Sequence, residues 1–277
     1  GVRQFKFVDR TFNLKIENIR RILDFFKTNW RDGLYLHFEI FPDRLSGEML
    51  EEIRRFPDGG LHLEAGVQSF YQPSLKAVSR RQDEQKTLDN LRFIREQTGA
   101  EIHADLVAGL PYSTYDTFSR DFDKLMAVRP QELQLGILKR LRGAPIDRHS
   151  QVCAMVYSKY PPYEIMQNKD MSYAELQRIK RIARYLDIFY NSGNFPHTVE
   201  LLLGAQASCF AAMDDFSRFI WENYQQTHKI SIGRQTRILF EYLQKYYPLQ
   251  EIATALLADY DGKGRKDNVC YLREILK

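Results

Sequence analysis

The sequence has few cysteines, and they lie far apart. Only three of its 277 residues are cysteine: Cys153, Cys209 and Cys270. An odd number without paired spacing argues against a disulfide framework and fits a reducing compartment, so we expect a cytoplasmic protein. Cys209 lies in an apolar, helix-like stretch, where a lone cysteine usually belongs to the hydrophobic core.

The sequence also lacks a long apolar run and a block of like charge. No stretch is long enough to cross a bilayer, and the N-terminus does not look like a signal peptide, so we expect no membrane association. Its 40 Lys and Arg against 36 Asp and Glu give a net charge of +4, without the basic stripe of a nucleic-acid-binding protein. A hydrophobic content of 44% is typical of an ordinary globular chain, with one large domain or two small ones. The oligomeric state stays open.

The first half of the chain alternates between strand-like and helix-like segments. The strand-like segments are 2–8, 34–40, 61–67, 102–110 and 131–139. This alternation predicts parallel strands joined by right-handed helical crossovers. An eight-strand barrel needs about 250 residues, so the fold class is α/β with a partial (β/α) barrel of about five or six parallel strands over residues 1–147. Asn13 is expected to cap the first helix.

The pattern changes after residue 147. A proline-bearing link at 160–164 leads into amphipathic helical stretches that are rich in aromatic residues, and residues 262–267 read as a polar turn. Residues 148–277 are therefore predicted to form an all-helical C-terminal domain. Its tyrosines and phenylalanines are more typical of helix packing than of a cofactor site.

Three short motifs in a fixed order resemble a known family. GVQSF at 66–70, VSRRQD at 78–83 and DLVAGLP at 105–111 resemble the middle of the radical S-adenosylmethionine (radical-SAM) enzymes. The most similar branch contains oxygen-independent coproporphyrinogen III oxidase and the cobalamin-binding radical-SAM proteins. The resemblance covers roughly the first half of the chain. The segment from PPYE to YNSGNF, 161–195, resembles a C-terminal domain of uncharacterised function attached to some cobalamin-binding members.

The resemblance implies cofactors that this chain does not hold by itself. The family binds a [4Fe-4S] cluster through Cys-x3-Cys-x2-Cys, a spacing that is absent here, so the cluster ligands are not in this chain. We favour the interpretation that the first strand corresponds to the family's second strand and that the cysteine loop precedes Gly1. The alternative is a degenerate member that never had the cluster. In both cases we expect the fragment alone to be inactive and to bind S-adenosylmethionine weakly or not at all.

The intact protein is implied to cleave S-adenosylmethionine reductively and to act on a small-molecule substrate. Cobalamin carried on an upstream domain, with transfer of a methyl group, is a further implication of the resemblance. The aromatic C-terminal half would then offer, as a minority interpretation, a docking surface for that domain or for a flat tetrapyrrole-like substrate.

The candidate cofactor-binding residues lie at or near the carboxyl ends of the strands, where ligands bind in parallel sheets. By resemblance, a glutamate and an aspartate contact polar groups of the co-substrate, an amide both donates and accepts, a guanidinium holds the methionine carboxylate, and a glycine admits the adenine. An acid inside an apolar strand should also face a site or a partner. The candidates are Glu39, Glu64, Gln68, Arg80, Asp105 and Gly109. Asp9 is a further candidate, although VDRTFN departs from the family's loop.

Structural roles and other functions stay open for these residues. Glu39 and Gln68 could satisfy backbone groups, and Asp105 could pair with Arg81 or His103. A cluster-free barrel that acts as a binding or scaffold module is the main alternative.

A metal-dependent hydrolase is the second alternative. It would use two strand pairs, His62 with Glu64 and His103 with Asp105, around a metal ion. A triad of His37, His62 and His103 is less favoured, because the sequence suggests two separate pairs.

Overall fold

The computed structural model describes residues 2–8, 11–143, 145–263 and 269–277. The chain divides into two compact units, Gly1–Leu176 and Gln177–Lys277. The boundary that the sequence suggests between residues 147 and 148 stays a prediction.

The first unit is built on a sheet of five parallel strands. They are β1 (Gln4–Lys6), β2 (Tyr35–Ile40), β3 (Leu61–Gln68), β4 (Glu101–Ala108) and β5 (Glu132–Ile137), and their spatial order follows the sequence order. Helices connect successive strands, as the alternation in the sequence predicted. The α/β class with a partial barrel-like sheet is thereby confirmed.

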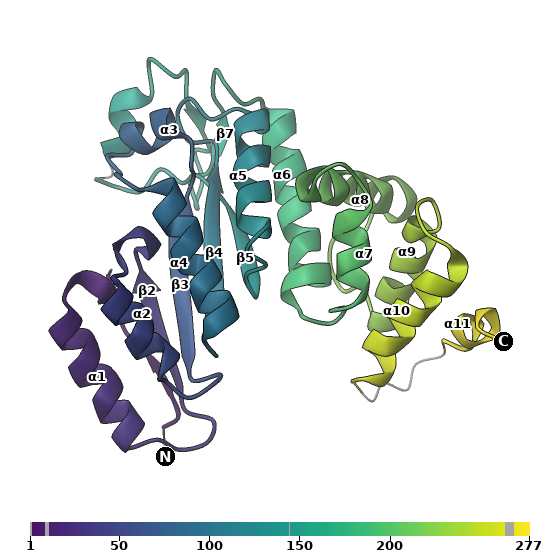
Figure 1. Ribbon diagram of the computed structural model, residues 1–277. Helices are drawn as coiled ribbons and strands as arrows, with labels where there is room; N and C mark the ends of the chain where they lie inside the picture. Colours follow the sequence, from purple (N-terminus) through teal and green to yellow (C-terminus); the bar gives the residue numbers. More distant parts are fainter. Residues whose placement is uncertain (1, 9–10, 144, 264–268) are drawn as a thin grey trace. The chain divides into compact units, whose positions relative to one another are not determined.

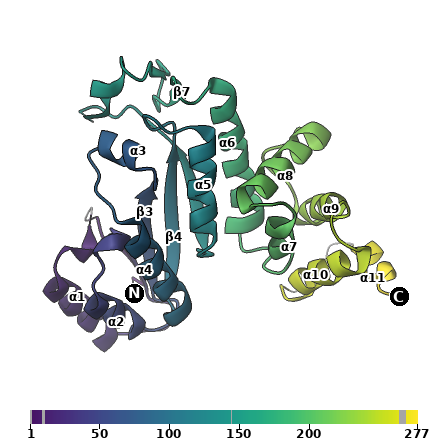
Figure 2. The same ribbon diagram turned by 45° about the horizontal axis from the view of Figure 1, so that its top comes forward.

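Helices cover the apolar face of the sheet (Figures 1 and 2). Every second residue along a strand points to this face, and residues at these positions, such as Phe38, Leu63 and Leu106, are fully buried. Leu23 and Phe122 are equally buried on the helices that pack there. Alternation of side chains along each strand then leaves the opposite face to the polar residues. The helices are α1 (Ile16–Thr28), α2 (Gly47–Arg54), α3 (Gln72–Ala77), α4 (Glu84–Gln97) and α5 (Tyr115–Met126).

Three of these helices, α2, α4 and α5, begin at a residue whose side chain caps the helix. Ser46, Asp83 and Thr114 each accept a hydrogen bond from the backbone N–H three residues later. The predicted cap at Asn13 is wrong, because α1 begins after Lys15 without a side-chain cap. Asn13 is instead buried, and its amide exchanges two hydrogen bonds with the backbone of Phe41, at 2.7 and 2.9 Å.

The part after residue 147 is mainly helical, with one addition. A two-stranded antiparallel sheet, β6 (Val156–Tyr157) with β7 (Ile165–Gln167), was not predicted. Among the described residues no helix is long and apolar enough to span a membrane. The predicted polar turn at 262–267 lies mostly outside the described residues. The helices are α6 (Tyr173–Leu186), α7 (Thr198–Gly204), α8 (Cys209–Tyr224), α9 (Ile232–Leu243), α10 (Leu249–Asp261) and α11 (Cys270–Ile275).

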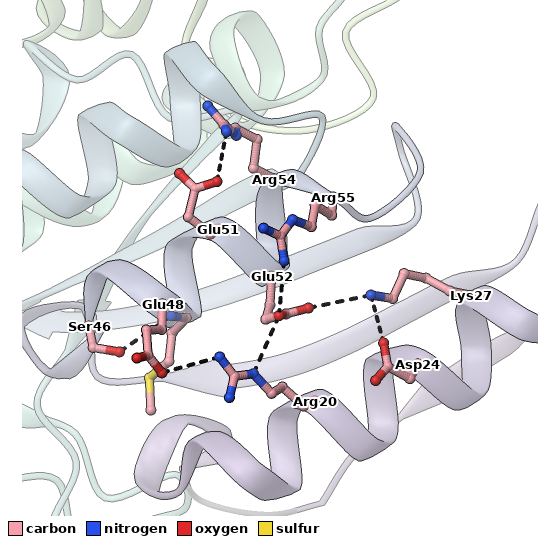
Figure 3. A network of polar contacts seen from close by, with 10 residues as sticks. Arg20, Asp24, Lys27, Ser46, Glu48, Glu51, Glu52, Arg54 and Arg55 are labelled. Carbon is pink, nitrogen blue, oxygen red and sulfur yellow. Dashed lines mark hydrogen bonds and ion pairs between the residues drawn. The ribbon is translucent and has the colours of Figure 1, made fainter.

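A network of charged side chains joins α1 to α2 (Figure 3). At its centre is Glu52, whose side chain is only 9% exposed. It lies 3.4 Å from nitrogen atoms of Arg20 and Lys27 on α1 and of Arg55 beyond α2. A carboxylate this buried needs such partners, because an unpaired buried charge is costly.

We expect Glu52→Ala to lower the free energy of unfolding by about 1–2 kcal/mol, because three cations lose their shared acceptor. Urea denaturation followed by circular dichroism measures the change. The matched control is Glu51→Ala on the same helix, which breaks a single exposed pair with Arg54 and should cost less than about 0.5 kcal/mol. Equal effects of the two substitutions would show that the central position of Glu52 is unimportant.

Candidate functional site

The polar face of the sheet gathers most of the sequence-predicted site residues. Register pairs Glu39 with Glu64 and Gly66 with Asp105, so these strand positions lie side by side. Glu39 is exposed, whereas Glu64 and Asp105 are partly buried. Parallel pairing therefore brings three carboxylates to one area, near the carboxyl end of β2 and in the middle of β3 and β4.

Histidines and further carboxylates continue this face toward the amino ends of the strands. The rings of His37 and His62 stack with centroids 4.7 Å apart, and His62 Nε2 lies 3.4 Å from His103 Nδ1. His37 Nε2 is 2.8 Å from Glu64 Oε1, and His103 Nε2 is 3.9 Å from Asp105 Oδ1. The two His–carboxylate pairs expected to be separate are thus one network, because Glu64 and His103 are register partners.

This network is not arranged around a metal ion. In the part of the chain that the structure describes, no group of three or more His, Cys, Asp or Glu side chains converges on a point that could hold one. The imidazoles contact one another and the carboxylates instead of facing a common centre.

The electrostatics of the face are dominated by its acids. Burial raises the pKa of Asp105 to about 6; His103 lowers it, Glu64 and Glu39 raise it, and Arg80 lowers it. Burial would raise the pKa of Glu64 as well, but contacts with His37 and Lys6 hold it below its ordinary value. The Oδ1 atom of Asp105 is buried and makes no hydrogen bond within the described chain. Asp105 therefore has an unused acceptor on the polar face.

Arg80 is already engaged. Its Nη2 donates to the carbonyl of Gly66, its Nε donates to Gln82 at 3.2 Å, and its guanidinium lies 4.8 Å from the ring centre of Phe41. Burial lowers its pKa, and Asp43 opposes that effect. The predicted two-pronged contact with a ligand carboxylate would have to use the guanidinium N–H groups that these two bonds leave over.

Gln68 ends β3 in an unusual backbone conformation. Its φ is +70°, in the left-handed region that favours glycine, next to an irregularity in the pairing with β4. No hydrogen bond holds its side-chain amide within the described residues, so both its donor and its acceptor are available to a ligand.

Asp121, a residue that the sequence analysis did not single out, fixes the turn after Gln68. It is 4% exposed on α5 and accepts hydrogen bonds from Ser69 Oγ at 2.5 Å and from the Phe70 N–H at 2.9 Å. The signal in the sequence was an acid on the apolar stripe of α5, between Phe118 and Phe122. Such a buried acid must have partners.

Gly109 follows β4, and packing accounts for its lack of a side chain. Its φ is +83°, and a Cβ atom there would lie 2.5 Å from Ile165 Cγ2 on β7. Its carbonyl accepts a hydrogen bond from Asn168 at 3.1 Å. The suggested contact with adenine stays a prediction, as do the other ligand contacts. Asp9 lies outside the described residues.

Comparisons with known proteins cover different parts of the chain. Residues 153–277 match the model of a protein family of unknown function, DUF4080. A 70-residue stretch is 36% identical to oxygen-independent coproporphyrinogen III oxidase of Pseudomonas aeruginosa, covering 25% of this chain and 15% of the oxidase. Among solved structures, the cobalamin-dependent S-adenosylmethionine radical enzyme OxsB aligns with 99% of this chain at a TM-score of 0.50 and 11% identity.

The chain resembles radical-SAM enzymes. The radical S-adenosylmethionine methyltransferase TsrM from Kitasatospora setae, solved with cobalamin and a [4Fe-4S] cluster bound, also aligns, at a TM-score of 0.47 and 17% identity over 64% of this chain. The chain spans 15% of the curated oxidase, 35% of TsrM and half of OxsB. At 11% identity the alignment with OxsB supports a shared fold, and what these proteins bind is a property of theirs.

The hydrogen bonds of Asp121 give a stability prediction. We expect Asp121→Ala to lower the free energy of unfolding by about 2 kcal/mol, because a buried hydroxyl and a buried N–H lose their acceptor. Asp116→Ala on the same helix is the control, since Asp116 is exposed and its carboxylate pairs with the equally exposed Arg120. Thermal denaturation of both variants measures the difference. A loss for Asp121→Ala no larger than the control's would contradict this role.

The raised pKa of Asp105 gives a pH prediction. A folded-state pKa of about 6 against an ordinary value of 3.8 means that the folded protein holds this proton more tightly than the unfolded chain. Asp105 therefore destabilises the fold as pH rises from about 4 through 6. We expect Asp105→Asn to stabilise the protein by about 1–2 kcal/mol at pH 7.5 and by much less at pH 4.5. Urea denaturation at both pH values measures this, and a gain that does not depend on pH would count against the raised pKa.

Proposed function

We propose that this chain is the S-adenosylmethionine-binding part of a radical-SAM enzyme. The observation that carries the proposal is the grouping of four polar side chains on one face of a five-stranded parallel sheet: Glu39 and Gln68 near the carboxyl ends of their strands, and Glu64 and Asp105 in the middle of theirs. The partial sequence match to coproporphyrinogen III oxidase and the fold shared with OxsB support it.

The residues present fit this co-substrate. Glu39 and Glu64 offer negative charge to a sulfonium and an ammonium group. Asp105 offers ribose hydroxyls a buried acceptor that makes no hydrogen bond among the described residues, and Gln68 offers both a donor and an acceptor. Arg80 would hold the end of β3 in place through its hydrogen bond to the Gly66 carbonyl, in addition to any contact with the ligand.

The residues present do not fit an iron–sulfur cluster. Cys153 is fully buried, and Cys209 and Cys270 lie in the second compact unit. We therefore propose that the cluster ligands belong to a part of the protein outside these 277 residues, as would a cobalamin-binding domain. Such a cluster would supply the electron for reductive cleavage of S-adenosylmethionine, and this chemistry would serve methyl transfer or oxidation of a small molecule.

The test uses the natural protein that contains this chain, purified without oxygen. We expect a four-iron cluster and formation of 5′-deoxyadenosine after reduction. Gln68→Ala should lower that yield roughly tenfold or more, equivalent to about 1.4 kcal/mol or more of lost co-substrate binding. The matched control is Glu101→Gln, on the same face but at the amino end of β4, where little change is expected.

Two results would contradict the proposal. A natural protein without a Cys-x3-Cys-x2-Cys loop and without iron would favour the cluster-free binding or scaffold module. A cluster-bearing protein in which Gln68→Ala and Glu101→Gln behave alike would place the co-substrate elsewhere.

A further inference from the structure

The second compact unit contains a cavity that the proposed function does not use. It has a volume of about 1070 Å³, in the upper range for small-molecule sites. It lies between the end of α8, the helix α9 and the start of α11. Its lining consists of Asn223, Tyr224, Ser231, Gly233, Arg234, Arg237, Phe240, Glu241, Gln244 and Tyr271.

Several hydrogen-bond donors in this cavity are unused. The hydroxyl of Tyr271 is buried and has no hydrogen-bond partner among the described residues. The hydroxyl of Ser231 makes no capping bond to α9. The guanidinium of Arg234 lies 5.3 Å from the ring centre of Tyr224, without an ion pair to any described carboxylate. A buried hydroxyl without a partner is costly, so a ligand that accepts hydrogen bonds would stabilise this arrangement.

The one carboxylate in the lining is already neutralised. Glu241 Oε1 lies 3.0 Å from Arg237 Nε, and its other oxygen accepts a hydrogen bond from the Tyr224 hydroxyl. The charge of Arg234 is thus left uncompensated, and the cavity favours an anion. Its rings add an apolar wall, in which Phe240 and Tyr271 meet edge to face with centroids 5.4 Å apart.

We propose that this cavity binds a small molecule that carries an oxyanion, phosphate or carboxylate, on a flat ring. Arg234, Ser231 and Tyr271 would donate to the oxyanion, while Tyr224 and Phe240 would contact the ring. Guanidinium groups suit both oxyanions, because their parallel N–H groups match two oxygens.

Isothermal titration of the 277-residue chain with four probes tests the proposal: phenyl phosphate, benzoate, inorganic phosphate and phenol. We expect one of the two ring-bearing anions to bind at least roughly tenfold more tightly than inorganic phosphate or phenol. Inorganic phosphate lacks the ring and phenol lacks the oxyanion, so each of them can use only one part of the lining. The stronger of phenyl phosphate and benzoate then identifies the oxyanion. Equal binding of all four probes, or binding of none, would overturn the proposal.

Substitutions locate the binding. Arg234→Gln and Tyr271→Phe should each weaken the preferred probe, by at least tenfold and severalfold respectively. The matched control is Arg181→Gln, because Arg181 lies over a different ring, that of Trp221, also at 5.3 Å and outside the cavity. The Arg181→Gln variant should bind the preferred probe as tightly as the unchanged chain does. A loss in the control equal to that of Arg234→Gln would indicate nonspecific charge attraction and overturn the site. Circular dichroism of each variant checks folding, and co-substrate cleavage plays no part in the readout.

Discussion

The register of β3 against its two neighbours decides which side chains share the polar face. His62, Glu64 and Gly66 lie on that face, and parallel pairing sets Glu64 between Glu39 and His103. A slip of one residue would turn Leu63 and Ala65 toward the polar side and bury the acids beneath the helices. The apolar packing of the helices therefore determines the geometry of the candidate site, although no helix residue takes part in the histidine–carboxylate network.

Electrostatic interactions on the polar face of the sheet destabilise the fold, and hydrophobic burial on the opposite face offsets that cost. Burial raises the pKa of Asp105, and repulsion from Glu64 and Glu39 on the adjacent strands raises it further. Fully buried residues such as Phe38, Leu63 and Leu106 supply the opposing hydrophobic term. Groups held in an unfavourable electrostatic state by the rest of the fold are typical of binding and catalytic sites. In this protein the groups in an unfavourable electrostatic state lie on the polar face of the sheet, in the middle of β3 and β4.

The sequence predicted the sheet well because period-two and period-3.6 patterns are local properties. All five strands and the parallel arrangement followed from that alternation. Contacts between distant segments were out of reach. The engagement of Arg80 with Gly66, the buried Asn13 against Phe41 and the hold of Asp121 on Ser69 all depend on how separate segments meet. The sequence analysis also did not predict that the two His–carboxylate pairs form one network. That depends on the register between β3 and β4, which the sequence of neither strand determines by itself.

The family of unknown function begins before the first compact unit ends. Its model starts at residue 153, whereas the unit that contains the sheet continues to Leu176. In this overlap the Ile165 N–H donates to the Leu138 carbonyl at 2.8 Å, and Asn168 holds the carbonyl of Gly109. The short β6–β7 sheet thus packs at the carboxyl ends of β4 and β5. Residue 109 is a glycine because a Cβ atom there would clash with Ile165. The first residues that the family model matches therefore pack against the carboxyl end of the sheet in this chain, so sequence changes in β7 and at the end of β4 should constrain one another through this contact.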